Sequence, residues 1–419
     1  MQRLLLLSTT TGYQAQQFRA AAEHIGIPLV LATDCCHQLD DPWGDGAISV
    51  RFQEPGESAG KIVEFARHHP IHGVVAIGDA PTMTAALVAG HLGIRFHSPP
   101  AVELCRNKFL ARERYQQAGM RVPWYARFRT VSDPVQAAKT VPYPCVLKPL
   151  GLSASRGVMR ANDETEFVAA FRRIVALLRQ KDVKIMRDES AGWLQVESFI
   201  PGREVALEGL VRGGRLKVLA LFDKPDPLDG PFFEETIYVT PSRLDDATQQ
   251  AITECTQQAI TALDLTDGPV HTELRINKEG PWMLEVAARP IGGLCAGALR
   301  FTRDGQPLSL EELILRHALG ELVEGIAREA AASGVMMVPI PQEGTYEGVE
   351  NVEAAEQVPG IERVEITAKL QQKLIPLPEG ASYLGFIFAR CGTPEAVEEA
   401  LREAHRRLRF LISSPIPVF

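Results

Sequence analysis

Two glutamates placed symmetrically about a turn are the residues of this chain with the plainest chemistry. In residues 270–293 (VHTELRINKEGPWMLEVAARPIGG), apolar and polar positions alternate on both sides of a short turn. A three-residue turn centred on Glu279 ends on glycine, which suits a hairpin loop that needs a left-handed residue. That turn pairs Glu273 with Glu285, and paired side chains lie about 5 Å apart at Cβ.

Period-two alternation divides this hairpin into a polar face and an apolar face. The polar face is expected to carry His271, Glu273, Arg275, Met283, Glu285 and Arg289. The apolar face is expected to carry Val270, Thr272, Leu274, Ile276, Trp282, Leu284, Val286 and Ala288.

The paired glutamates need a positive partner. Two carboxylates at this separation repel by about 4 kcal/mol at an effective dielectric constant of about 20. The partner is either a neighbouring arginine or a divalent metal ion, and oxygen-only ligands favour Mg²⁺ or Mn²⁺ over zinc. For the hairpin taken alone, a solvated sheet face with surface ion pairs stays open as the alternative.

A lysine at the end of an apolar strand is the second feature with clear chemistry. The strand 145–148 ends on Lys148, and the small-residue loop 151–157 (GLSASRG) follows it. The amine supplies positive charge, and small residues let backbone N–H groups approach phosphate oxygens. The loop does not match GxxxxGK[ST], so a flexible surface hairpin remains the alternative here.

A bend in the next strand adds two more carboxylates. Residues 195–204 (QVESFIPGRE) turn at Pro201 and Gly202, which places Glu197 before the bend and Glu204 after it. A strand end with free backbone N–H and C=O groups can pair with an adenine edge, and a carboxylate can accept hydrogen bonds from ribose hydroxyls.

The elements that must position these residues follow from apolar periodicity. The first hundred residues alternate strand and helix signals, which predicts parallel strands with helical crossovers. Strands are expected at 4–8, 28–33, 73–77, 145–148, 194–200, 334–339 and 382–389. Helices are expected at 15–24, 81–91, 107–118, 164–178, 246–263, 308–319 and 394–407. Residues 9–12 (TTTG) lack the GxGxxG pattern of a dinucleotide site, and residues 122–142 are expected to form a linker.

Composition excludes several classes of function. The net charge of −8 and the scattered basic residues argue against nucleic-acid binding. The seven cysteines form no CxxC pair, which is typical of reduced cytosolic thiols. No apolar run has the length of a membrane span. We therefore expect a cytoplasmic protein without nucleic-acid or membrane partners.

In their order and spacing, these motifs resemble those of ATP-grasp carboxylate–amine ligases, and most closely those of the L-amino acid ligases, which form dipeptides. The resemblance covers nearly the whole chain. It rests on Asn107-Lys108, Lys148, the loop 151–157, ESFIPGRE (197–204), FFEETIYVTPS (232–242), Glu273, EVAARPIGG (285–293) and Tyr383 to Phe386.

This resemblance implies a multidomain fold of the α/β and α+β classes. A Rossmann-like pre-ATP-grasp domain would span residues 1–105, and the ATP-grasp domain would span residues 106–325. The latter would include a flexible lid at about 144–202. An α+β domain at 326–419 would follow, as structural support or as a cover over the site.

The resemblance also implies a role for each candidate site residue. Lys108 and Lys148 would hold the α- and β-phosphates of ATP, and the loop around Ser155 and Gly157 would close over the triphosphate. The adenine hinge would include Glu197, Phe199 and Ile200.

The remaining roles concern ribose, metal and substrate. Glu204 would contact the ribose, Glu273 and Glu285 would hold Mg²⁺ (or Mn²⁺), and Arg289 would face the reacting carboxylate or acyl-phosphate. Many ATP-grasp enzymes carry asparagine two residues after the second metal glutamate, whereas this chain has Ala287. The number of bound metal ions therefore stays open.

The implied reaction joins an amino-acid carboxylate to an amine, or to a second amino acid, through an acyl-phosphate, with release of ADP and phosphate. Other ATP-grasp reactions, of the biotin-carboxylase or ribotide-ligase type, and a non-catalytic ATP-binding regulator are the alternatives. A homodimer is the default expectation for the assembly.

Overall fold

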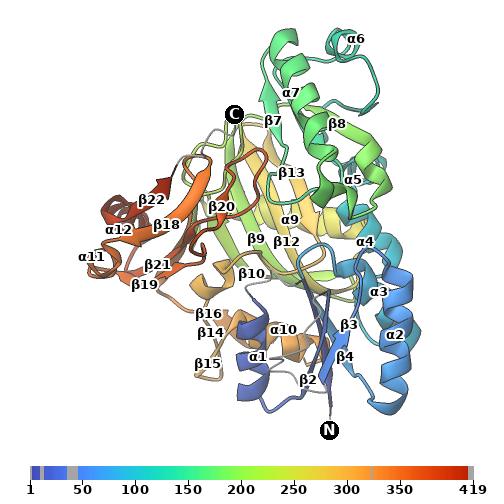
Figure 1. The fold of residues 1–419 in the computed structure, drawn as a ribbon. Coiled ribbons are helices and arrows are strands. Elements are labelled where there is room, and N and C mark those ends of the chain that lie inside the picture. Colours follow the sequence, from blue (N-terminus) through green and yellow to red (C-terminus); the bar gives the residue numbers. More distant parts are fainter. Residues whose placement is uncertain (1, 10–13, 35–45, 322–323, 414–419) are drawn as a thin grey trace.

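A computed structural model describes residues 2–9, 14–34, 46–321 and 324–413. A long central sheet runs through the molecule, with the N-terminal unit below it and the lid above it (Figure 1). The residues after 325, which we call the C-terminal unit, lie to one side (Figure 1). Within these described ranges, no helix combines the length and the apolar character needed to cross a membrane.

The N-terminal unit is a parallel sheet with helical crossovers, as the alternation predicts. Its strand order is β3-β2-β1-β4, and every pair is parallel. The strands are β1 (Leu4–Ser8), β2 (Leu29–Thr33), β3 (Ala47–Ser49) and β4 (Gly73–Ile77). The helices are α1 (Ala15–His24), α2 (Pro55–His68), α3 (Thr82–Leu92) and α4 (Pro99–Arg106). Most of the loop 9–12 lies outside the described residues.

The central sheet has eight strands in the order β13-β12-β9-β10-β11-β17-β21-β19. Five are β9 (Arg203–Arg212), β10 (Arg215–Asp223), β11 (Ile237–Thr240), β12 (Asp267–Asn277) and β13 (Gly280–Ala287). Three come from the C-terminal unit: β17 (Ala332–Val338), β19 (Ile361–Ile366) and β21 (Gly385–Cys391). The sheet therefore continues across the boundary expected at residue 325, because β11 pairs with β17.

The glutamate hairpin has the expected pairing but a different turn. Glu273 pairs with Glu285, as predicted. The turn has two residues rather than three, because Asn277 pairs with Gly280. A β-bulge between the pairs Leu274–Met283 and Glu273–Glu285 adds one residue to β13 and restores the register.

The bulge corrects the predicted faces of the hairpin. Met283 is buried in the core opposite Leu274, whereas it was expected on the polar face. Leu284 lines a cavity, whereas it was expected in the core. Trp282 pairs with Arg275 and so shares the face of that arginine. Beyond the bulge, Val286 lies in the core as predicted.

The lid is a four-stranded sheet in the order β5-β8-β6-β7, covered by helices. Its strands are β5 (Tyr125–Arg129), β6 (Cys145–Pro149), β7 (Met159–Ala161) and β8 (Trp193–Ser198). Its helices are α6 (Pro134–Ala138), α7 (Glu164–Leu178) and α8 (Lys181–Lys184). The linker predicted at 122–142 is wrong, because β5 and α6 belong to this folded unit.

The remaining elements complete the layers. Helix α9 (Asp246–Ala262) packs on β10 and β13 of the central sheet, and α5 (Lys108–Gln117) packs on α9 and on β5 of the lid. Other elements are α10 (Leu310–Ala318), α11 (Val352–Glu356), α12 (Pro394–Arg407), β14 (Phe301–Arg303), β15 (Gln306–Leu308) and β16 (Ile326–Arg328). The last short sheet joins β18 (Gly344–Glu350), β20 (Lys373–Leu374) and β22 (Arg409–Ser413).

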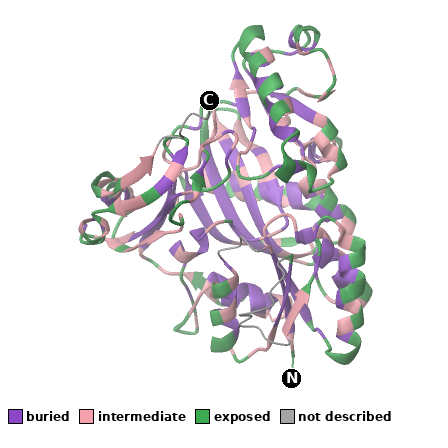
Figure 2. Cartoon of the chain, viewed as in Figure 1, coloured by how far each residue is buried: buried purple, intermediate pink, exposed green. Residues whose placement is uncertain are grey.

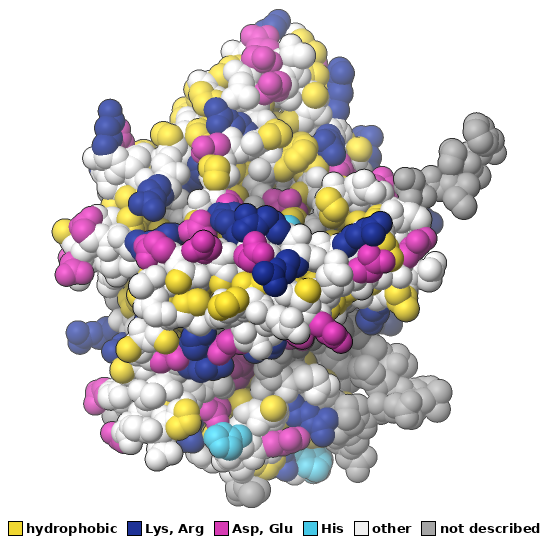
Figure 3. All heavy atoms as spheres, turned by 90° about the vertical axis from the view of Figure 1, so that its left-hand side faces the viewer, with side chains coloured by type: hydrophobic (Ala, Val, Ile, Leu, Met, Phe, Trp, Pro, Cys, Tyr) yellow, Lys and Arg dark blue, Asp and Glu magenta, His cyan; other side chains and the backbone are white. Residues whose placement is uncertain are grey.

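Burial concentrates where these units meet. Figure 2 shows the central strands buried along most of their length, while the outer helices expose one side. One continuous core joins Leu5 and Leu7 of β1 to Leu207 of β9 and Leu274 of β12. On the face seen in Figure 3, acidic and basic side chains are interleaved.

Two buried histidines at this junction predict acid sensitivity. The Nε2 atoms of His97 and His317 lie 3.4 Å from the Pro269 carbonyl oxygen and 3.0 Å from the Val211 carbonyl oxygen. Burial lowers the pKa of each ring to about 4. The ordinary histidine pKa is about 6.5, so the unfolded chain binds more protons than the folded chain between pH 6.5 and pH 4. Each histidine therefore removes about 3 kcal/mol of stability as the pH falls through that window.

The variant His97→Gln is expected to lose less stability between pH 7 and pH 4 than the parent protein. Urea unfolding at several pH values measures this slope. The exposed His91, changed to glutamine, serves as the matched control. Equal slopes for His97→Gln and for the parent protein would contradict the assignment.

Candidate active site

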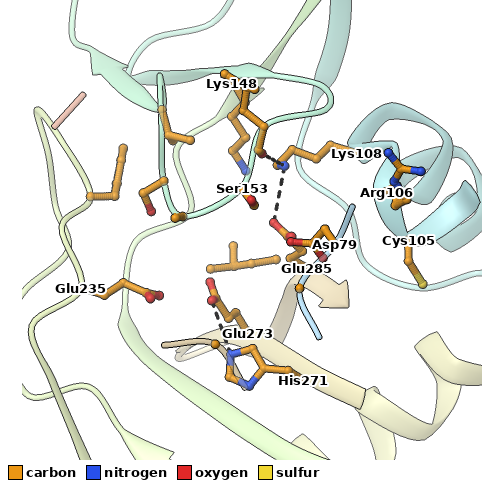
Figure 4. A pocket seen from close by; sticks show the side chains of 18 of the residues that line it. Asp79, Cys105, Arg106, Lys108, Lys148, Ser153, Glu235, His271, Glu273 and Glu285 are labelled. Atoms are coloured by element: carbon orange, nitrogen blue, oxygen red, sulfur yellow. Dashed lines mark hydrogen bonds and ion pairs between the residues drawn. The ribbon is translucent and has the colours of Figure 1, made fainter. Parts of the chain in front are cut away.

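A cavity of about 460 Å³ lies where the N-terminal unit, the lid, the hairpin and the C-terminal unit meet. Ten of the eleven residues predicted for the site line it: Lys108, Lys148, Ser155, Glu197, Phe199, Ile200, Glu204, Glu273, Glu285 and Arg289. Gly157 is not among the lining residues, and its N–H donates to the Pro378 carbonyl oxygen at 2.8 Å. Figure 4 shows lysines from the lid and α5 on one side and carboxylates from the hairpin on the other.

A buried carboxylate on β8 orients the strand lysine. Lys148 donates to one oxygen of Glu197 at 2.6 Å, and Arg112 donates to the other at 2.6 Å. Burial opposes the charge on Glu197, yet Arg112 and Lys148 together hold its pKa below the ordinary value. Burial lowers the pKa of Lys148, and Glu197 opposes that shift. This contact keeps the amine fixed at the edge of the cavity.

Arg112 also links this network to the glutamate hairpin. Its Nη1 donates at 2.7 Å to the carbonyl oxygen of Met283, which lies next to the bulge. An extra residue in a strand leaves backbone groups outside the regular ladder, and a buried unpaired carbonyl is costly. Arg112 thus stabilises the bulge that sets the face of Glu285.

The second predicted phosphate lysine bridges the lid and the hairpin. The side chain of Asn107 caps the helix that Lys108 begins. The Lys108 amine donates to the carbonyl oxygen of Leu152 in the small-residue loop at 2.8 Å. It also lies 3.7 Å from a Glu285 carboxylate oxygen. Figure 4 shows this amine between the loop and the carboxylate.

Three carboxylates, those of Glu204, Glu235 and Glu273, gather at the other end of the cavity, with oxygens within 4.8 Å of one another. The buried ammonium of Lys224 lies among them, 2.9 Å from Glu204 and 3.5 Å from Glu273, and it also pairs with Glu235. Burial opposes the charge on Lys224, but the three carboxylates raise its pKa well above the usual range. Lys224 therefore supplies the positive charge that this cluster needs.

The carboxylates of the cluster differ in their proton affinity. Burial raises the pKa of Glu235 to about 7, and the nearby charge of Glu273 adds to this effect. For Glu273, burial acts in the same direction, but Lys224 and His271 outweigh it and hold the pKa below its usual range. The proton affinity of Glu235 is therefore raised and that of Glu273 is lowered.

A second buried pair supports the turn that leaves the hairpin. Glu208 is fully buried, and its two oxygens accept from the backbone N–H of Ile291 at 3.1 and 3.2 Å. One of these oxygens also lies 3.1 Å from His271 Nδ1. Gln14 donates to the Ile291 carbonyl oxygen at 2.6 Å. The backbone after Arg289 is therefore held on both sides.

Arg289 is paired with a residue that the sequence alone did not single out as a site residue. Its Nε and Nη2 donate to the two oxygens of Asp79 at 3.0 and 3.1 Å. Burial opposes the charge on Asp79, and Arg289 lowers the pKa of that carboxyl. Asp79 follows Gly78 at the carboxyl end of β4, and this edge of a parallel sheet is where ligands bind.

Lys224 and Glu235, like Arg112, are residues of the site that sequence reasoning missed. Lys224 follows the last residue of β10, a strand that was not predicted. Glu235 belongs to the FFEETIYVTPS motif, which was noted without a role for this carboxylate. Their closeness to Glu273 depends on the pairing of β9 with both β10 and β12.

The carboxylates of the hairpin fit a magnesium ion. Glu273 and Glu285 are paired across the strands, and their side chains keep 26% and 34% of their surface exposed inside the cavity. These are hard oxygen ligands, which Mg²⁺ prefers. Ala287 has no ligand atom and is buried opposite His271. The set on the hairpin therefore offers two carboxylates and no amide oxygen at position 287.

Comparison with known proteins identifies two domains of this chain and a similar solved structure. Residues 141–298 match the family described as the ATP-grasp domain, and residues 336–413 match L-amino acid ligase C-terminal domain 2. The crystal structure of an L-amino acid ligase from Bacillus licheniformis superposes with a TM-score of 0.79 at 25% identity. That match covers 98% of this chain and 99% of the other.

Two curated relatives agree with these matches. An uncharacterized protein of Sinorhizobium fredii is 22% identical, over 99% of this chain and 84% of its own length. Alanine–anticapsin ligase of Bacillus subtilis is 28% identical over 48% of this chain. The match with this chain covers 44% of the length of that ligase.

The ATP-grasp domain, the ligase relatives and the superposed structure thus identify an ATP-grasp enzyme of the carboxylate–amine ligase class. Within that class the chain is L-amino acid ligase-like, since its C-terminal unit matches the domain of that name and its structure superposes on such a ligase.

The Arg112 network predicts a specific pattern of stability. Arg112→Met leaves Glu197 with one cation and leaves the Met283 carbonyl unpaired, so it is expected to cost about 3–5 kcal/mol. The double variant Arg112→Met with Glu197→Gln removes the uncompensated charge and is expected to regain part of this loss. Urea unfolding of both variants measures the difference. A double variant at least as unstable as the single one would contradict this account.

Proposed function

We propose that the protein is an ATP-dependent ligase that joins the carboxylate of one amino acid to the amine of another, or to a related amine. The reaction proceeds through an acyl-phosphate and releases ADP and phosphate. The observation that carries the proposal is that Lys108, Lys148, Glu273, Glu285 and Arg289 line one cavity. The similarity to alanine–anticapsin ligase and to an L-amino acid ligase supports it.

The chemical difficulty is that a carboxylate has no good leaving group. Attack of a carboxylate oxygen on the γ-phosphorus of ATP forms the acyl-phosphate and breaks the bond to the β-phosphate oxygen, so ADP leaves. Attack of the amine on the acyl carbon forms the amide and expels phosphate, and the amine loses a proton. Bound at Glu273 and Glu285, a divalent ion would neutralise charge on the phosphate oxygens.

The residues of this chain have distinct tasks in this scheme. Lys148, fixed by Glu197, and Lys108 place two ammonium groups where the phosphates would lie. Asp79 fixes the guanidinium of Arg289, which keeps donors free for the carboxylate or its phosphate. The small-residue loop, contacted by Lys108 at Leu152, covers this region and excludes water.

Other ATP-grasp reactions are the alternative to this proposal. Solved structures of N5-carboxyaminoimidazole ribonucleotide synthetases and of a biotin carboxylase domain share this fold at 14–19% identity, which concerns the fold alone. Ala287 is the one feature that favours a non-catalytic ATP-binding protein. The divisions near residues 105 and 325, the homodimer and the cytoplasmic location stay predictions.

A pairwise amino-acid screen tests the proposal directly. The purified protein, with ATP and Mg²⁺, is expected to release phosphate with some pairs of amino acids and to form a product whose mass is the sum of the pair minus water. ATP turnover without any amide product, across all pairs and simple amines, would overturn the ligase assignment.

The metal assignment predicts a sharp effect at Glu285. Glu285→Gln is expected to lower turnover by about 10²-fold or more, because it removes charge that balances the metal and phosphates. The fold is expected to persist, since the side chain is one-third exposed and lies 3.7 Å from its cation, Lys108. Turnover as a function of Mg²⁺ and the midpoint of thermal unfolding are measured together. Glu279→Gln, at the exposed turn of the same hairpin, is the control. Parent-like turnover at ordinary magnesium would rule the assignment out.

A further inference from the structure

A short loop of the C-terminal unit reaches the lid next to the small-residue loop. It spans residues 375–380, between β20 and β21, and we call it the latch loop. The N–H of Gly380 donates to the Pro376 carbonyl oxygen at 2.9 Å and closes the loop. A Cβ on Gly380 would lie 1.7 Å from the Ile375 carbonyl oxygen, so the loop is too tight for a side chain there.

The latch loop makes polar contacts with three lid residues. The Pro378 carbonyl oxygen accepts from the N–H of Gly157 at 2.8 Å, and the Glu379 carbonyl oxygen accepts from Arg156 Nε at 2.8 Å. The carboxylate of Glu379 accepts from Arg173 on α7 in a two-bond pair, at 2.5 and 2.8 Å. Two of these three lid residues end the small-residue loop 151–157.

The contacts of the latch loop fall on the end of the small-residue loop, whose backbone is strained and closely packed. Ala154 and Ser155 have φ angles of +55° and +53°, which side chains rarely adopt. Gly157 has a φ of +76°, and a Cβ there would meet Pro149 at 2.7 Å. The loop therefore depends on its neighbours for its shape, and the latch loop lies outside the lid.

The Arg173–Glu379 contact between the lid and the latch loop is weak enough for a lid that opens and closes. The side chains of Arg173 and Glu379 are 46% and 28% exposed, and ion pairs of such exposure are individually weak. On its other side the lid pairs Arg187 with Glu54 of the N-terminal unit at 2.9 Å. The lid is thus bridged on both sides by contacts that can be broken to admit ATP and release ADP.

We propose that the latch loop of the C-terminal unit holds the small-residue loop closed over the activated carboxylate, with Glu379 as the positioning residue. This inference rests on the proposed ligase function. When the lid is loose, water attacks the acyl carbon in place of the amine. The same bond to phosphate breaks, and the products are the original carboxylate and free phosphate. An unlatched enzyme therefore consumes ATP without making an amide.

The first test measures coupling between ATP consumption and amide formation. Glu379→Gln and Arg173→Met are each expected to raise the ratio of phosphate to amide at least threefold. The double variant is expected to raise it no further. Exchanging the charges, Arg173→Glu with Glu379→Arg, is expected to return the ratio to within twofold of the parent value.

The second test does not need ligase activity. Hydrogen–deuterium exchange of the peptide that contains residues 151–157 is measured with Mg-ADP bound, and it is expected to be faster in Glu379→Gln than in the parent. Glu403→Gln is the matched control, because Glu403 forms exposed ion pairs with Arg406 and Arg407 on α12 of the same unit. In Glu403→Gln, the exchange of the peptide that contains residues 151–157 and the ratio of phosphate to amide are both expected to equal those of the parent.

The two tests separate the two ideas. Exchange in Glu379→Gln equal to that of the control overturns the latch, whatever the ligase assays show. If no amino-acid pair yields an amide, the proposed function fails, and the exchange measurement still decides whether the latch loop holds the lid.

Discussion

The site depends on one buried carboxylate that holds two cations. The buried carboxylate of Glu197 accepts from Lys148 and from Arg112, and Arg112 extends to the Met283 carbonyl. Removing charges from water is costly, so such a network persists only when every member has a partner. Because of this constraint, Lys148 and the bulge that directs Glu285 are parts of one rigid arrangement.

The rest of the cavity follows the same rule of paired charges. Lys224 lies among three carboxylates, and Asp79 holds Arg289 through two parallel bonds. Of the hairpin carboxylates, Glu273 and Glu285 still keep 26% and 34% of their side-chain surface exposed. An electrostatic environment fixed before substrate arrives needs little reorganisation during phosphoryl transfer.

Each structural unit contributes to the same chemistry. The N-terminal unit supplies Asp79, the lid supplies Lys148 and the small-residue loop, and the hairpin supplies Glu273 and Glu285. The C-terminal unit extends the central sheet through β17 and approaches the lid with residues 375–380. The shared central sheet therefore places the C-terminal unit next to the lid. The small-residue loop has a strained backbone, so its shape depends on contacts with such neighbours.

The sequence by itself determined the elements with strong local signals. Apolar periodicity located α1, α7 and α12 to the residue. The predicted pairing of Glu273 with Glu285 is also observed, but through a two-residue turn and a bulge rather than the predicted three-residue turn. Only the tertiary structure decided the bulge, the burial of Met283, and the partners Arg112, Asp79 and Lys224. A bulge changes register through long-range hydrogen bonds, and a side chain recruits a distant partner only when strands far apart in the chain pair. Local periodicity carries no information about either event.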